Sequence, residues 1–226
     1  MIFIIGLLLL LLILYGPQLW VRAVMARYSR ERKDFPGTGG QLARHLLDRA
    51  ALDGVAVEIS DEGDHYDPRR QVVALSPEHY RGRSLTAVAV AAHEVGHALQ
   101  DQAGYRPLRI RHRLVEMSQG LQRVGSVLVL AAPLLLIASR SPAGLVVPLV
   151  GGLLSMGTAA VVHLVTLPVE LDASFRRALP LLNSGYLSPE DHPGARRILT
   201  AAALTYVAAS LASLLNLWNW LRLARR

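Results

Sequence analysis

Cysteine is absent from this chain of 226 residues, and charged and aromatic residues are scarce. Without cysteine, disulfide frameworks, thiol catalysis and thiolate metal sites are excluded, which leaves histidine and carboxylates as candidate metal ligands. Charged residues make up 18% of the chain, whereas an average soluble domain contains about 25%. Hydrophobic residues make up 52%. This composition is typical of a protein with membrane-embedded segments.

The hydrophobic residues are concentrated in four stretches that lack Lys, Arg, Asp and Glu. They cover residues 1–21, 124–139, 141–169 and 198–221. A membrane-spanning helix needs roughly 20 apolar residues, and the second stretch reaches this length when it is counted from Met117. We therefore predict four transmembrane helices. The first has no basic region before it and no small-residue cleavage site after it, so we expect an uncleaved anchor.

The excess of basic residues, 24 Lys and Arg against 17 Asp and Glu, is explained better by membrane topology than by nucleic acid. Basic residues cluster in 22–33, 106–113 and 176–197, which flank the predicted spans on one side of the membrane. Aromatic residues that would stack on bases are not regularly interleaved with them. We therefore expect no nucleic-acid partner, and we predict that 22–117 and 170–197 face the cytoplasm.

The segment between the first two predicted spans has the pattern of a small α+β domain. Hydrophobic periodicity predicts a helix at 38–51, strands at 55–60 and 71–76, and a long helix at 84–102. Turn residues predict a turn at 61–70, between the two strands. Ser84 is typical of a helix N-cap and Gly104 of a helix end. The expected order is therefore helix, β-hairpin, helix.

The long helix contains the sequence His-Glu-Val-Gly-His at positions 93–97. On a helix, His93 and His97 are one turn apart and point the same way, so both imidazoles can bind one ion. Glu94 stands one position further round, where a carboxylate can accept a proton from the water at the open position of a catalytic zinc. The alternative is two surface histidines on an ordinary helix. The apolar residues around the motif favour the metal site.

A catalytic zinc takes three protein ligands, and the third must come from elsewhere in the chain. The extended pattern HExxHxxGxxH, which supplies a third histidine, is absent. Glu170 is the best candidate, because it follows a long uncharged stretch where the chain should leave the membrane on the side that holds helix 84–102. The alternative is an interfacial Glu170 paired with Arg176 or Arg177.

Four segments carry a further signal, and they are DHYDPR (64–69), VAAHEVGHALQD (90–101), TLPVELDASFRRA (166–178) and AAALTYVAA (201–209). In this order they resemble the bacterial membrane-bound neutral zinc metallopeptidase family (YugP-like), and the resemblance extends over essentially the whole chain. It implies a membrane-embedded zinc peptidase of the gluzincin type, with one zinc ion per chain, in the bacterial cell (inner) membrane. His93, His97 and Glu170 stand at the family's metal positions, and Glu94 stands at its catalytic position.

The resemblance leaves open which residue orients a ligand imidazole. Better-understood gluzincins often have an aspartate four residues after the glutamate ligand, whereas this chain has Ser174 there, and Asp172 is the nearest acid. His163 lies two helical turns before Glu170, so it is a candidate for stabilising the oxyanion or supporting a ligand, and the equal alternative is a hydrogen bond to a backbone carbonyl between helices. Tyr206 and His65 are further candidates for these roles.

The sequence therefore predicts an α-rich integral membrane protein of about four transmembrane helices. It also predicts a small α+β domain of the minimal zincin type, which carries the HExxH helix and a β-hairpin. The chain is expected to begin with an N-terminal anchor (1–24) and a zinc peptidase domain (25–117). A transmembrane hairpin (118–169), a third-ligand segment with a cytoplasmic loop (170–197) and a C-terminal span (198–226) follow. We expect strand 71–76 to form a sheet edge, where an extended substrate can pair with it.

The predicted function is hydrolysis of peptide bonds by a zinc-activated water, with Glu94 as the general base, in membrane-protein quality control. The expected partners are a protein or peptide substrate and the lipid bilayer, with other membrane proteins or an oligomer as further candidates. One alternative is a non-proteolytic zinc-binding membrane scaffold or assembly subunit. The other, a metal transporter, is disfavoured because polar residues of a soluble helix follow the motif, namely Gln100, Asp101 and Gln102.

Overall fold

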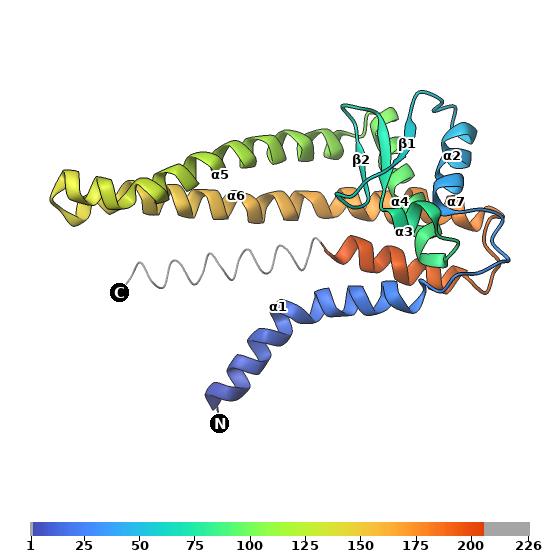
Figure 1. Cartoon of the computed structure of the whole chain (residues 1–226), viewed down its shortest axis with the longest axis horizontal. Helices are drawn as coiled ribbons and strands as arrows, with labels where there is room; N and C mark the ends of the chain where they lie inside the picture. The colour runs from blue at the N-terminus through green and yellow to red at the C-terminus, as the bar shows by residue number, and fades with distance from the viewer. Residues whose placement is uncertain (1, 206–226) are drawn as a thin grey trace. The chain divides into compact units, whose positions relative to one another are not determined.

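A computed structural model describes residues 2–205 of the chain (Figure 1). The described chain is mostly helical and contains one small three-stranded sheet. It forms two compact units. Unit 1 consists of the residues up to Leu108 together with Leu167–Thr205, and the described part of unit 2 is Arg109–Thr166. The sheet and the HEVGH helix belong to unit 1.

Unit 1 begins with α1 (Ile2–Arg27), a long apolar helix that contains Pro17. A proline inside a helix removes one amide hydrogen bond and displaces the preceding turn, so the helix bends. Figure 1 shows a bend within α1. The described part of unit 1 ends with a helix over 192–205. Most of the predicted C-terminal span, 198–226, lies outside the described residues.

The predicted helix at 38–51 is present as α2 (Gly39–Arg49). A capping box closes its first turn: Thr38 Oγ1 accepts from the Gln41 amide at 3.3 Å, and the Gln41 side chain accepts from the Thr38 amide at 2.9 Å. The predicted apolar stripe is buried against the HEVGH helix, and its leucines are Leu42, Leu46 and Leu47.

The sheet contains the strands β1 (Ala56–Ile59), β2 (His65–Asp67) and β3 (Val72–Leu75). Their spatial order is β1–β3–β2, with β1 parallel and β2 antiparallel to β3. The strands predicted at 55–60 and 71–76 are both present, but the prediction that they form a β-hairpin is wrong, because they run parallel. The hairpin consists of β2 and β3 instead.

The strand β2 lies inside segment 61–70, which the sequence predicts as a turn. Three residues are too few to show an alternating pattern, and the Asp, Gly and Pro residues around them are typical of turns. β3 lies between β1 and β2 in the sheet and pairs with both. The expectation that strand 71–76 is a sheet edge is therefore also wrong. The two edge strands are β1 and β2.

After the sheet come the short helix α3 (Pro77–Arg81) and the long helix α4 (Leu85–Gln102), which carries the HEVGH motif. Ser84 caps α4 as predicted, since its Oγ accepts from the Ala87 amide at 3.1 Å. Gly104 has a φ of 61°, the left-handed conformation that ends a helix. α4 is buried along nearly its whole length and forms the centre of the hydrophobic core of unit 1.

A second helical segment of unit 1 packs closely against α4. It consists of the π-helix η2 (Asp172–Ala178) and α7 (Leu179–Asn183). At Gly96 the two backbones approach closely, because a Cβ atom added there would lie 2.8 Å from the carbonyl oxygen of Ala173. Only glycine lets the two backbones come this close.

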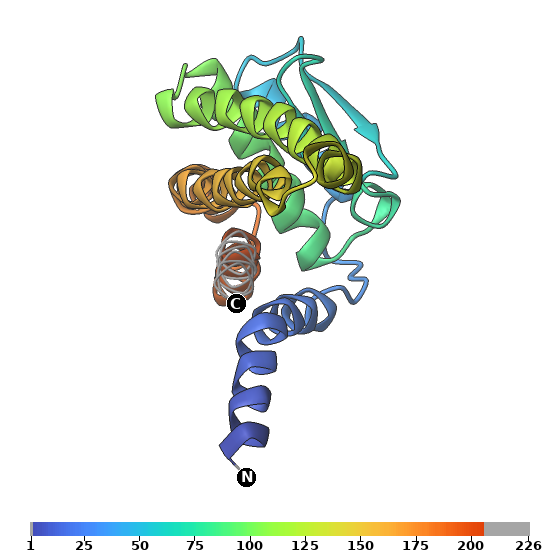
Figure 2. The same ribbon diagram turned by 90° about the vertical axis from the view of Figure 1, so that its left-hand side faces the viewer.

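Unit 2 is a helical hairpin. The helices α5 (Arg106–Ser139) and α6 (Val146–Leu171) are joined by the short 3-10 helix η1 (Pro142–Leu145) and lie side by side in Figures 1 and 2. They touch where Leu128 faces Gly151, because a Cβ added at this glycine would lie 2.9 Å from the leucine.

Large apolar side chains are exposed along both helices of the hairpin, among them Val127, Leu130, Leu134, Ile137, Val147, Leu154 and Leu164. α5 is long and apolar enough to cross a membrane: its most apolar 18 residues have a mean hydropathy of 1.9, and 6% of them are buried. It is the one helix within 2–205 that meets these criteria. The larger number, four transmembrane helices, stays a prediction.

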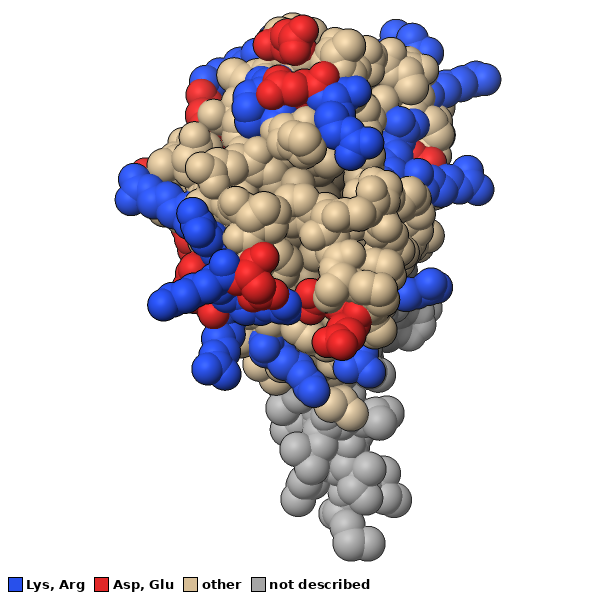
Figure 3. Space-filling model, turned by 90° about the vertical axis from the view of Figure 1, so that its right-hand side faces the viewer, with Lys and Arg blue, Asp and Glu red and all other residues tan. Residues whose placement is uncertain are grey.

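Basic and acidic side chains are mixed on the face shown in Figure 3, where Lys and Arg are widely spread and Asp and Glu lie between them. Ion pairs within unit 1 include Arg70 with Glu58 at 2.8 Å and Arg32 with Asp191. On this face the basic residues do not form the continuous stripe that nucleic-acid binding uses.

We predict that Gly96→Ala lowers the stability of unit 1 by about 1–3 kcal/mol, because the added methyl group forces α4 away from η2. The matched control is Gly120→Ala, a helical glycine of α5 whose Cβ would meet nothing within 4 Å. Thermal unfolding of both variants in detergent measures the difference. Equal melting temperatures for the two variants would contradict the proposed role of Gly96.

Candidate metal centre

The two histidines of the motif lie inside the core of unit 1. His93 and His97 project from the same face of α4, and their rings meet edge to face with centroids 4.8 Å apart. Their exposed fractions are 5% and 6%. The alternative of two surface histidines is therefore wrong.

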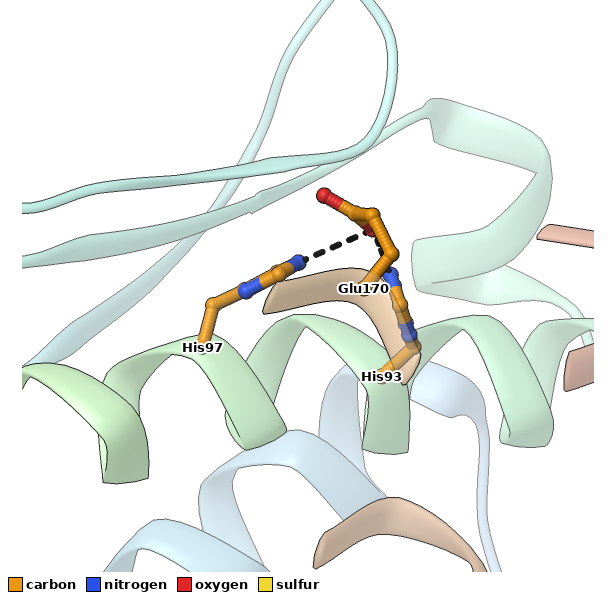
Figure 4. Close-up of side chains that lie close together, drawn as sticks. All are labelled: His93, His97 and Glu170. Carbon is orange, nitrogen blue, oxygen red and sulfur yellow. Dashed lines mark hydrogen bonds and ion pairs between the residues drawn. The ribbon is translucent and has the colours of Figure 1, made fainter. Parts of the chain in front are cut away.

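Glu170, near the end of α6, reaches the same point (Figure 4). Its Oε2 atom lies 3.0 Å from His93 Nε2 and 3.4 Å from His97 Nε2. One ligand atom from each of these three buried residues lies within 4.8 Å of the other two. The structure thus brings the three predicted metal ligands together.

The two arginines of the alternative ion pair engage a different acid. Arg177 Nε donates to Asp172 Oδ2 at 2.9 Å, and Arg176 lies 4.0 Å from Asp172 Oδ1. Burial raises the pKa of Asp172, but the hydrogen bonds from Arg177 and Gln100 and the charge of Arg177 lower it below its usual value.

Hydrogen bonds on the far side of each imidazole assign the tautomers. His93 Nδ1 lies 3.1 Å from Ser174 Oγ, and this hydroxyl donates its own hydrogen to the Leu199 carbonyl at 3.3 Å. His97 Nδ1 lies 2.9 Å from Gln100 Oε1, which can only accept. Both Nδ1 atoms therefore carry hydrogen and donate it, which leaves the Nε2 atoms to face Glu170.

Gln100 is held in place by its own amide group. Its Nε2 atom donates to the Val169 carbonyl at 2.8 Å and to Asp172 Oδ2 at 2.9 Å. The side chain is fully buried. A chain of hydrogen bonds thus runs from Arg177 through Asp172 and Gln100 to His97, and it fixes the orientation of the imidazole.

Sequence reasoning missed the role of Gln100 and left that of Ser174 open. The available signal was position: Gln100 is three residues after His97, so it lies on the same helix face. Ser174 stands four residues after Glu170, where the family resemblance suggested an aspartate, and its hydroxyl reaches His93. A serine and a glutamine thus hold the two histidines of the motif, and Asp172 acts through the glutamine.

The carboxylate of Glu170 is ionised in these surroundings. Burial raises the pKa of a carboxyl group, but the charge of His97 and the hydrogen bonds to both histidines lower the pKa of Glu170 well below its usual value. With Nδ1–H assigned on both rings, Nε2 is the atom of each ring that faces the anionic Oε2, either protonated, as in these hydrogen bonds, or bound to a metal ion. Such a cluster requires positive charge between its members, and two imidazoles with one carboxylate are a donor set that zinc prefers.

The remaining predicted residues are distributed as follows. Glu94 is 7% exposed and follows the first histidine on α4. His65 belongs to β2, where its Nδ1 lies 3.1 Å from the Gly63 carbonyl. His163 lies on α6 in unit 2, and its side chain is not among those described. Tyr206 lies outside the described residues.

Comparison with known proteins identifies the family. Residues 2–225 match the family described as "putative neutral zinc metallopeptidase". The chain is 38% identical over 205 residues to the "Putative membrane protease YugP" of Bacillus subtilis (strain 168). The aligned region covers 90% of this chain and 88% of the relative. No solved structure matches the chain. By both measures, the chain belongs to the neutral zinc metallopeptidase family that this description names.

Proposed function

We propose that this protein is a membrane-bound, zinc-dependent endopeptidase in which His93, His97 and Glu170 hold one zinc ion and Glu94 is the general base. The observation that carries the proposal is the convergence of two Nε2 atoms and one carboxylate oxygen in a buried site. The hydrogen bonds on both Nδ1 atoms support it, because they point the metal-binding nitrogen of each ring inward.

Zinc in this site would lower the pKa of a bound water towards about 7 and polarise the substrate carbonyl. Glu94 accepts a proton from the attacking water and then passes it to the leaving amine. The hydrogen bonds that His93 donates to Ser174 and His97 donates to Gln100 keep the imidazoles from turning during the reaction. Glu170 stays ionised, so it does not compete with Glu94 for the proton.

An extended peptide is the substrate form that the sheet favours. β2 is an edge strand that packs against α4, and the Tyr66 hydroxyl fixes it there by donating to Asp101 Oδ2 at 2.9 Å. A peptide that adds to such an edge is held through main-chain hydrogen bonds, with little demand on its sequence. Low selectivity of this kind fits a role in membrane-protein quality control.

We place the protein in the bacterial cell (inner) membrane as a multi-pass protein, with unit 1 facing the cytoplasm. The apolar exposed surface of α5 supports a membrane location, and a relative is named a membrane protease. The basic residues at 22–33, 106–113 and 176–197 support the orientation, because such residues accumulate on the cytoplasmic side.

The first prediction of this proposed function concerns metal content. Wild-type protein and Glu94→Gln should each retain one zinc ion per chain after dialysis, because all three ligands are intact. Glu170→Gln should lose the metal, since two histidines alone are too few ligands for a stable site. Elemental analysis of purified protein measures this, and a Glu170→Gln variant with full zinc content would exclude Glu170 as a ligand.

The second prediction concerns catalysis. Glu94→Gln should lower kcat on dye-labelled casein by about 10²–10⁴-fold, because the water loses its proton acceptor. The matched control is Glu190→Gln, which changes an exposed glutamate of unit 1 and should keep wild-type activity. If zinc-loaded wild type is as inactive as Glu94→Gln, the non-proteolytic scaffold becomes the better explanation.

The third prediction concerns the support of His97. Gln100→Ala should weaken zinc binding by about 10–100-fold, because the imidazole loses the group that orients it. Gln102→Ala changes an exposed glutamine at the end of the same helix and should have no effect. Competition with a chromophoric chelator gives both affinities, and equal values would remove Gln100 from the metal centre.

A further inference from the structure

A second pair of a histidine and a carboxylate lies outside the metal ligands. Asp64, in the loop between β1 and β2, and His79, in α3, are joined by a contact of 2.7 Å between Asp64 Oδ2 and His79 Nδ1. The other oxygen, Asp64 Oδ1, accepts from the Ser76 amide at 2.8 Å and from the Ser76 hydroxyl at 3.1 Å. Both carboxylate oxygens are thus engaged, and the imidazole is held in one orientation.

The helix that carries His79 packs on the helix of the general base. Gly39 lies between them, and a Cβ there would clash with the carbonyl oxygens of His79 and Ala87. Ala87 is seven residues before Glu94, two turns along the same face of α4. α3 is visible beside α4 in Figure 4, and the two helices are in contact.

The charges around His79 favour its protonated form. Burial lowers the pKa of this imidazole, but the hydrogen bond and charge of Asp64, together with the charges of Glu78 and Glu94, raise it above its usual value. For Asp64, burial raises the pKa, but the hydrogen bond and charge of His79 lower it below its usual value. A cationic imidazole therefore stands within electrostatic reach of Glu94.

We propose that His79, held by Asp64, is a further catalytic residue, which donates a hydrogen bond from Nε2 to the carbonyl oxygen of the scissile peptide bond. This inference rests on the proposed peptidase function. During attack, the water oxygen bonds to the carbonyl carbon, one water proton passes to Glu94, and the carbonyl oxygen gains negative charge. When the C–N bond breaks, that proton leaves with the amine. His79 keeps its own proton throughout and stabilises the oxyanion.

His79 suits this role better than the described candidates predicted from the sequence. Asp172 is an anion, so it would repel an oxyanion, and its Oδ2 atom already accepts from Gln100 and Arg177. His65 has no carboxylate partner among the described residues, whereas His79 has one at 2.7 Å. A histidine oriented and charged by a carboxylate is the stronger donor.

The test uses the full chain, loaded with zinc in detergent, and dye-labelled casein as the probe. His79→Phe removes the donor but keeps an aromatic ring, and we expect kcat to fall roughly 100-fold. KM, zinc content and the melting temperature should stay at wild-type values. The matched control is His45→Ala, an exposed histidine of α2, which should leave kcat unchanged.

The pH profile of His79→Gln separates catalysis from folding. Because the pKa of His79 is raised, its cationic form persists to higher pH than that of an ordinary histidine and is lost as the pH rises through that pKa. The kcat of the wild type should therefore fall on the alkaline side, whereas His79→Gln, with a neutral donor, should retain part of the activity and lack this fall.

Three results would count against these proposals, and they are distinguishable. A His79→Phe enzyme with wild-type kcat would overturn the assignment, as would a His79→Gln enzyme with the wild-type alkaline limb. If His79→Phe does not fold, the profile of His79→Gln decides alone. A zinc-loaded wild type that cleaves casein no faster than Glu94→Gln would contradict the peptidase function. It would also contradict the catalytic role of His79, which depends on that function.

Discussion

The close approach of α4 and η2 is the constraint on which the candidate metal centre depends. The two histidines share a face of α4 because of their spacing, but the carboxylate comes from a segment more than seventy residues later. Gly96, between the histidines, lets the backbone at Ala173 come into contact with α4. This contact places Glu170 on one side of the crossing and Ser174 on the other, so that one of them binds at Nε2 and the other at Nδ1 of the same ring.

The polar groups of this crossing would destabilise the core if they were not paired. Leaving a buried amide or hydroxyl without a partner costs about 1–3 kcal/mol. In unit 1 the buried Gln100, Asp172 and Ser174 each have a partner. Gln100 contacts His97, Asp172 accepts from Gln100 and Arg177, and Ser174 contacts His93 and the Leu199 carbonyl. The hydrogen bonds that offset burial are thus the same ones that fix the imidazoles. Stability and metal geometry therefore depend on one network.

Sequence patterns predicted the parts of unit 1 that are local in the chain. The capped helices α2 and α4 and the strands β1 and β3 follow from periodicity and cap residues, and the i, i+4 spacing places His93 and His97. The parallel pairing of β1 with β3 could not be read, because the intervening β2 is three residues long and lies among turn residues. The hydrogen bond that orients the His93 imidazole could not be predicted either, since Ser174 and His93 are eighty-one residues apart in the chain. Such pairs depend on how the elements pack, and no local pattern encodes that.

The position of Glu170, the proposed third ligand, also shows how a membrane would constrain the site. Glu170 directly follows the predicted span 141–169, with no loop between them. Its segment is nevertheless tied to residues of unit 1: Gln100 binds the Val169 carbonyl, and Ser174 binds the Leu199 carbonyl. These buried hydrogen bonds hold the chain on both sides of Glu170. If 141–169 crosses the membrane as predicted, the end of this span sets the position of Glu170 relative to the bilayer. The hydrogen bonds within unit 1 set the position of Glu170 relative to the two histidines.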